Sequence, residues 1–134
     1  MRLILPFLAV VWSSSAGAQS LSGMGPAPNV AFTFATSGLL GANEQLPGIS
    51  WTSPVTLSRN LSTGTCTTAA MADTKITVFN GGTPIATVDY QPGNPLPVID
   101  IISAPLGAGA FVYAVAPSTQ DASLAGVSFT LGGR

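Results

Sequence analysis

Residues 75–90 read KITVFNGGTPIATVDY, and this stretch decides the fold class. Apolar side chains recur at every second position on both sides of Asn80-Gly81-Gly82. This alternation is typical of a half-buried β-strand, because successive side chains of a strand point to opposite faces. The glycines can supply the positive φ angles of a tight turn. The stretch therefore predicts a β-hairpin.

The same alternation recurs along the rest of the chain, and no long stretch repeats with the period of a helix. Eleven prolines and fifteen glycines suit short strands joined by turns. We therefore expect an all-β, immunoglobulin-like antiparallel β-sandwich of about seven strands. Strand 111–115 is expected to be buried on both faces, and residues 60–74 to form a loop or one helical turn. The predicted strands are residues 30–35, 55–58, 76–79, 85–90, 98–102, 111–115 and 127–131.

The N-terminus has the pattern of a secretory signal peptide. Arg2 gives a positive start, residues 3–12 are apolar apart from one proline, and Ala16-Gly17-Ala18 fits the small-residue cleavage pattern. About ten apolar residues are too few for a membrane-spanning helix, which needs roughly twenty. We therefore predict a signal peptide over 1–18, an extended leader over 19–29, a single domain over 30–134 and no integral membrane anchor. The protein is expected to be secreted or at the cell surface, with the periplasm as an open alternative.

Charged residues are scarce, and this scarcity restricts the partners. The chain has four cations against five acids, and removal of the signal peptide takes away Arg2. Three cations cannot build the basic surface that phosphate neutralisation requires, so nucleic acid is excluded as a partner. A surface with few charges also offers little repulsion against self-association. Self-association or a surface partner is the expected mode of interaction.

The residue types argue against an enzyme. The chain has no histidine, which removes the usual general base and the commonest transition-metal ligand. Asp89 and Asp100 are the best candidates for a carboxylate pair on neighbouring strands, but both are also explained as surface acids. No cofactor is expected, although calcium stays possible because it binds carboxylates and loop carbonyls. Cys66, the single cysteine, is expected to be buried, with a free thiol or an intermolecular bridge as alternatives. The residues that could contribute to a calcium site are Asp73, Asp89, Asn94 and Asp121.

Three aromatic residues are candidate ligand contacts, although core packing explains most aromatic side chains. Trp51 lies in a polar Ser-Trp-Thr step and could stack on a ligand ring. Phe79 lies opposite Ile76 and Val78, so it is either on the second face of a central strand or exposed. Tyr90 is the third candidate. The alternative function is a secreted module that binds carbohydrate or a small ligand, with Trp51, Tyr90 or Tyr113 as the stacking platform.

Residues 75–131 resemble the bacterial immunoglobulin-like domains of surface adhesins. The shared features are a strand and glycine turn over 76–85, the Leu-Gly step within 104–109, the aromatic strand 111–115 and a closing strand over 125–131. The resemblance implies an immunoglobulin-like sandwich with an adhesive role. The usual Asp-Ala-x-Gly-Asn turn of that family is replaced here at residues 120–123, which puts the calcium-linking role of the turn in doubt.

Together these features predict a non-catalytic structural or adhesive surface protein, with a subunit of an extracellular filament as one form of it. Val30, Phe32 and Phe34 alternate cleanly after a Gly/Pro-rich leader. This segment is the candidate for strand exchange, because an extended segment can add to the open sheet edge of a neighbouring copy.

Overall fold

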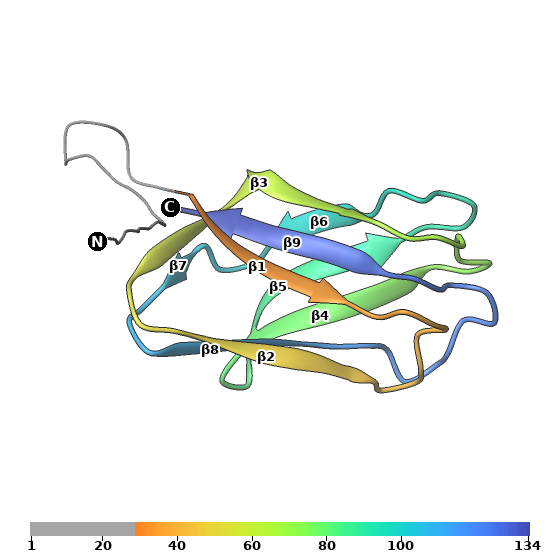
Figure 1. Ribbon diagram of the computed structural model, residues 1–134, viewed down its shortest axis with the longest axis horizontal. Coiled ribbons are helices and arrows are strands. Elements are labelled where there is room, and N and C mark those ends of the chain that lie inside the picture. Colours follow the sequence, from red (N-terminus) through yellow and green to blue (C-terminus); the bar gives the residue numbers. More distant parts are fainter. Residues whose placement is uncertain (1–28) are drawn as a thin grey trace, which may run out of the picture.

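The computed structural model describes residues 29–134 as two antiparallel β-sheets that pack on one another (Figure 1). Residues 1–28, which hold the predicted signal peptide and nearly all of the predicted leader, lie outside the described residues. Within the described range there is no helix, and hence none long and apolar enough to cross a membrane. The prediction of an all-β sandwich is confirmed.

The two sheets differ in size. One has four strands in the order β1-β9-β3-β7, and the other has five in the order β2-β8-β4-β5-β6. In Figure 1 the four-stranded sheet lies in front of the five-stranded sheet. The strands are β1 (Val30–Ala35), β2 (Gln45–Trp51), β3 (Val55–Thr65), β4 (Thr74–Asn80), β5 (Thr83–Tyr90), β6 (Val98–Ile101), β7 (Pro105–Leu106), β8 (Ala110–Val115) and β9 (Ser128–Gly133).

The predicted hairpin is formed by β4 and β5. Asn80 pairs with Thr83, so the turn has two residues, Gly81 and Gly82, whose φ angles are 58° and 102°. Positive φ at both positions matches the twist of the flanking strands, and glycine adopts it without a steric penalty. The Asn80 side chain also accepts a hydrogen bond from Phe111 N–H at 3.1 Å, which ties the turn to β8.

The middle of the four-stranded sheet is built around β9, which pairs with β1 on one side and β3 on the other. A Cβ atom on Gly132 would collide with the carbonyl oxygen of Leu61, so the two backbones lie too close for any side chain. The register between β3 and β9 shifts between Ser58 and Thr63, and there β3 leaves the regular ladder and forms an arch against Gly132. Ser62 Oγ donates to the Ser58 carbonyl at 2.8 Å and accepts from Gly132 N–H at 3.1 Å, which closes the arch.

The core lies between the sheets and is filled by the inward side chains of nearly every strand. The burial pattern of β1, with Phe32 and Phe34 inside and Thr33 and Ala35 outside, follows the predicted alternation. The largest fully buried side chains are Tyr90, Phe32, Phe34, Phe129, Leu46, Ile76, Leu124, Leu131, Val78, Val88, Val112 and Val127.

The structure departs from the sequence predictions at several strands. Residues 29–134 contain nine strands instead of about seven, because β2 and the two-residue β7 were not predicted. β3 continues to Thr65 through a segment expected to be a loop, while no helical turn forms over 67–73. β8 is not buried on both faces, since the Phe111 side chain is 43% exposed. Its outer face lacks a covering layer, because no helix or third sheet packs there among the described elements.

Candidate functional site

Strand β1 carries the candidate residues for strand exchange. It forms the edge of the four-stranded sheet and pairs only with β9, in a register that joins Val30 to Gly133 and Ala35 to Ser128. Phe34 stacks on Phe129 with ring centroids 5.2 Å apart. The predicted strand is thus confirmed, and in this structure it completes the core of its own chain.

The four edge strands of the sandwich are protected to different degrees. β2 contains Pro47 and a register shift between Leu46 and Ile49. β6 has four residues and carries Asp100, while β7 has only two residues. Short length, proline, charge and irregular register are devices that keep sheet edges from pairing with other chains. β1 has six residues and none of these devices, so it is the least protected edge in residues 29–134.

The outer face of the same sheet is lined by small, uncharged side chains. Thr33 on β1, Thr130 on β9 and Thr63 on β3 lie in one register row across three strands. The Oγ1 atoms of Thr33 and Thr130 are 2.9 Å apart and share a hydrogen bond. This row offers pairs of positions at which neighbouring strands can be cross-linked.

The candidate Trp51 lies at the end of β2 and is half-buried. Its ring meets Phe32 edge to face, with centroids 5.9 Å apart and planes at 79°. The indole therefore packs against β1 and supports the strand from the other sheet. Within residues 29–134 its buried Nε1 atom has no hydrogen-bond acceptor.

The structure corrects the prediction for Tyr90, which cannot contact a ligand. Its side chain is fully buried, and its hydroxyl donates to the Thr65 carbonyl at 2.9 Å, with the Ser128 carbonyl at 3.3 Å. Burial raises the pKa of the phenol, and the neighbouring Cys66 adds to that shift. Tyr90 thus connects the five-stranded sheet to β3 and β9 through the core.

Phe79 lies on the outer face of the central strand β4, as one of the two sequence interpretations expected. It stacks on Tyr113 of β8 with centroids 5.4 Å apart, and Tyr113 contacts Phe111 at 5.6 Å. We call these three residues the aromatic strip. A Cβ atom on Gly48 of β2 would collide with the Phe111 ring, so the ring rests where a side chain of β2 would otherwise stand.

Phe111 was not predicted as a site residue, because the apolar residues beside it indicated a fully buried strand. The signal that could have found the strip is the Phe-x-Tyr spacing of β8, which places both rings on one face. What the spacing does not reveal is that β4 is the neighbour of β8, which brings Phe79 to the same face.

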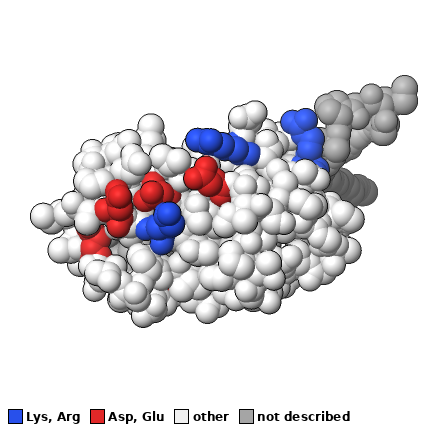
Figure 2. All heavy atoms as spheres, turned by 180° about the vertical axis from the view of Figure 1, so that it is seen from behind, with Lys and Arg blue, Asp and Glu red and all other residues white. Residues whose placement is uncertain are grey.

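Charges on the outer face of the five-stranded sheet are unevenly distributed. Figure 2 shows them in the left half and along the upper edge, with the lower right part of this face free of them. Lys75 and Asp89 pair in register at the end of the β4–β5 hairpin away from its turn. Arg59 and Asp100 form an exposed ion pair at 3.9 Å. The aromatic strip lies near the turn and has no charged neighbour in register.

Asp121 is the most strongly perturbed acid in the described part of the chain. Its Oδ2 accepts hydrogen bonds from Met71 N–H and Ala72 N–H, and its Oδ1 accepts from Ser123 N–H and Leu124 N–H, all at 2.9 Å. Burial acts to raise the pKa of this carboxyl, but the four backbone donors outweigh it and lower the pKa to about 2. Asp121 therefore links its own loop, through Ser123 and Leu124, to the loop that contains Met71 and Ala72.

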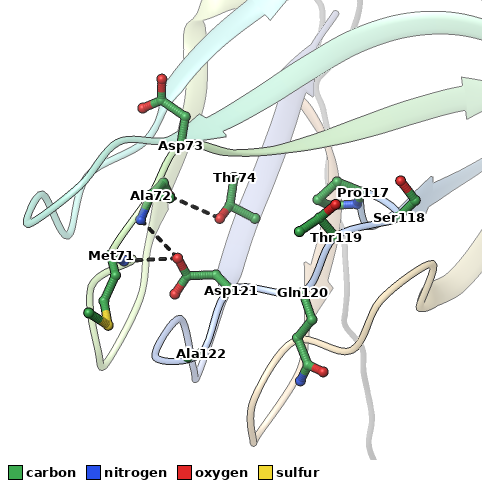
Figure 3. Close-up of a pocket in the computed structure, with 10 residues that line it drawn as sticks. All are labelled: Met71, Ala72, Asp73, Thr74, Pro117, Ser118, Thr119, Gln120, Asp121 and Ala122. Carbon is green, nitrogen blue, oxygen red and sulfur yellow. Dashed lines mark hydrogen bonds between the residues drawn. The ribbon is translucent and has the colours of Figure 1, made fainter.

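A surface hollow of about 390 Å³ lies beside Asp121, between residues 71–74 and 117–122. Figure 3 shows the Asp121 carboxylate turned toward the backbone of Met71 and Ala72. Since each of its oxygens already accepts two hydrogen bonds, this carboxylate has little capacity left for a ligand. The hollow thus follows from the way the two loops are joined.

The structure does not assemble the carboxylates into a metal site. In residues 29–134 no group of three His, Cys, Asp or Glu side chains could hold a metal ion. Asn94, another of the calcium candidates, uses its Oδ1 to accept a hydrogen bond from Leu96 N–H at 3.0 Å. Asp89 and Asp100 lie on adjacent strands as expected, and Asp100 faces Arg59.

Cys66 is buried, as the sequence analysis favoured. Its Sγ lies 3.7 Å from the Pro95 carbonyl oxygen, and burial raises the pKa of the thiol. A buried thiol with a raised pKa is a poor nucleophile, because the thiolate is the reactive form.

Compared with protein-family models, curated proteins and solved structures, the chain matches none of them.

Proposed function

We propose that this chain is an exported, non-catalytic structural or adhesive subunit that associates with other copies of itself by exchanging strand β1. The proposal rests on two properties that β1 combines. The strand supplies Phe32 and Phe34 to the core, and it also forms the least protected sheet edge.

An exchanged β1 would make the same contacts in a neighbouring copy as it makes in its own chain. The Phe34–Phe129 stack and the pairing with β9 would be formed between chains instead of within one. Domain swapping of this kind is a low-cost route to oligomers, because no new interface has to evolve. A reciprocal exchange gives a closed dimer, and a head-to-tail exchange gives an open filament.

The position of β9 favours this mode of assembly. With β1 removed, one side of β9 would be left without a partner along its whole length, and the core would be open beside Phe129. Such a groove has the shape of an extended strand, and the backbone groups of β9 would pair with any β1 that entered it.

We also propose that the sandwich is a variant of the immunoglobulin-like arrangement. In support, β3 pairs with β7 in one sheet and β4 pairs with β8 in the other, as the B–E and C–F strands do in that fold. The last strand differs, because β9 lies between β1 and β3 and not beside β8.

Disulfide trapping tests the exchange. A Thr33→Cys/Thr130→Cys variant, with Cys66→Ala, places two thiols at a registered pair of β1 and β9. Directly opposed residues of antiparallel strands are close enough for a disulfide. If β1 is exchanged, mild oxidation of the assembled mature chain links different chains, and a non-reducing gel shows covalent dimers or larger species.

The matched control is Thr63→Cys/Thr130→Cys in the same Cys66→Ala background. This pair joins β3 to β9, which stay in one chain whether or not β1 is exchanged. We expect only monomers from it. If the Thr33/Thr130 variant also gives only internally bridged monomers at every protein concentration, the exchange proposal is wrong.

A further inference from the structure

We propose that the aromatic strip of Phe111, Tyr113 and Phe79 is a binding site for neutral saccharides. This site lies on the outer face of the five-stranded sheet, whereas β1 is in the other sheet. The inference therefore stands apart from the exchange of β1 and fails or holds independently of it.

The strip has a feature that sheet stability alone does not explain. Cross-strand aromatic pairs such as Phe79 and Tyr113 stabilise a sheet, so their contact has a structural reason. Phe111 is different, because 43% of its surface is open to solvent although it is a large apolar side chain. The absence of a side chain at Gly48 leaves room for this ring above the backbone of β2.

The surroundings of the strip favour a neutral, hydroxyl-rich ligand. Around it, Ser50 and Gln45 on β2 and Thr77 on β4 are polar without charge, and Pro84 and Val115 are apolar. The nearest charged pair in register, Lys75 and Asp89, lies at the far end of the hairpin. A sugar ring has an apolar face of C–H groups that packs on an aromatic ring, while its hydroxyl groups bond to polar side chains at the margin. Aromatic walls with a few polar groups suit such a ligand.

A protein partner fits the same surface less well. A stable protein interface buries about 800 Å² on each side and has a core of several large apolar side chains. In residues 29–134 the other exposed large apolar residues, Leu39, Met71, Leu96 and Ile102, belong to loops outside strands β2, β4 and β8. The strip is therefore a small isolated aromatic surface, which matches one or a few sugar rings.

The test measures retention of the purified mature chain on insoluble cellulose, chitin, xylan, mannan and starch. Soluble oligosaccharides of any polymer that retains it then serve as competitors. We expect binding to at least one polymer. Phe111→Leu, which keeps an apolar side chain over Gly48 but removes the ring, should weaken that binding at least tenfold. Leu96→Ala, which removes a more exposed apolar side chain outside the strip, should bind as the unaltered chain does.

Thermal unfolding followed by Trp51 fluorescence establishes that each variant is folded. If Phe111→Leu does not fold, Tyr113→Ala serves in its place, with the same expected loss. The proposal is overturned if no polymer in the panel retains the chain, or if the strip variants bind as well as Leu96→Ala. It is also overturned if Phe111→Leu lowers self-association by light scattering and leaves retention unchanged, because the strip would then be a contact between copies.

Discussion

At the scale of single residues, Asp121 has the most definite consequence for stability. Its carboxylate accepts four backbone hydrogen bonds from two separate loops. In Asp121→Asn one oxygen is replaced by an NH₂ group, which faces N–H donors and cannot accept from them. Since hydrogen bonds to a charged group contribute about 1.5–3 kcal/mol each, we expect the variant to lose about 2–3 kcal/mol in the free energy of unfolding. Urea unfolding at neutral pH measures this loss.

The same residue links stability to pH. Its pKa is about 2 in the folded chain against 3.8 for a free aspartate, so the unfolded state binds the proton more readily. The stabilisation is complete above about pH 4 and declines as the pH falls toward 2. Asp121→Asn should therefore lose less stability than the unaltered chain over that interval. Equal acid slopes for the two proteins would show that the carboxylate is not the group responsible.

For single residues, the sequence predicts local features but not contacts with distant strands and loops. Alternation along β5 correctly gives the face on which Tyr90 lies, but the carbonyl groups that accept its hydroxyl come from β3 and β9. Two of the four hydrogen bonds of Asp121 are local, to the N–H groups of Ser123 and Leu124. Asp often forms such bonds within a turn, so these two could have been predicted. The other half reach residues 71 and 72, which no local pattern indicates.

At the scale of strands, the close approach of β3 and β9 depends on the absence of a side chain at Gly132. Gly132→Ala would push a methyl group into the Leu61 carbonyl, and the backbone of the arch would have to move. We expect a loss of about 2–3 kcal/mol, in the range of overpacked interiors, measured by chemical unfolding. Gly107→Ala is the control, since nothing lies within 4 Å of a Cβ atom there. A similar loss in both variants would mean that the packing at β9 is not the cause.

Strands with regular alternation were predictable, and interrupted ones were not. The β4–β5 hairpin was predicted together with its turn because the Asn-Gly-Gly sequence separates two alternating runs. β2 escaped prediction because Pro47 and Gly48 break the alternation at the point where its register shifts. Apart from Leu61, the second half of β3 consists of polar residues and glycine, so it has no hydrophobic alternation that would reveal its pairing with β9.

At the scale of the whole molecule, the scarcity of charge predicts how assembly responds to salt. The described residues carry three cations and five acids, and β1 carries none. Because electrostatic contributions at surfaces are screened over about 10 Å at 0.1 M salt, an assembly that depended on them would weaken as salt rises. We expect the oligomer fraction, measured by light scattering, to change less than about twofold between roughly 50 and 500 mM NaCl. A steep fall would indicate an interface built on ion pairs.

The order of strands in the sheets could not be predicted from the sequence. Alternation gives the number and the faces of the regular strands, but it does not say that β9 enters between β1 and β3. That placement depends on Gly132 and Gly133 meeting the backbone of β3, which is a property of the packed molecule. The aromatic strip escaped prediction for the same reason, because β4 and β8 are neighbours only in space.

The central position of β9 also imposes an order on folding. It is the last of the nine strands in residues 29–134, yet it separates two that precede it, β1 and β3. Synthesis proceeds from the N-terminus, so the four-stranded sheet cannot close until residues 128–133 have left the ribosome. A nascent chain of this topology therefore keeps its four-stranded sheet open until β9 has emerged, which is later than either of the strands with which β9 pairs.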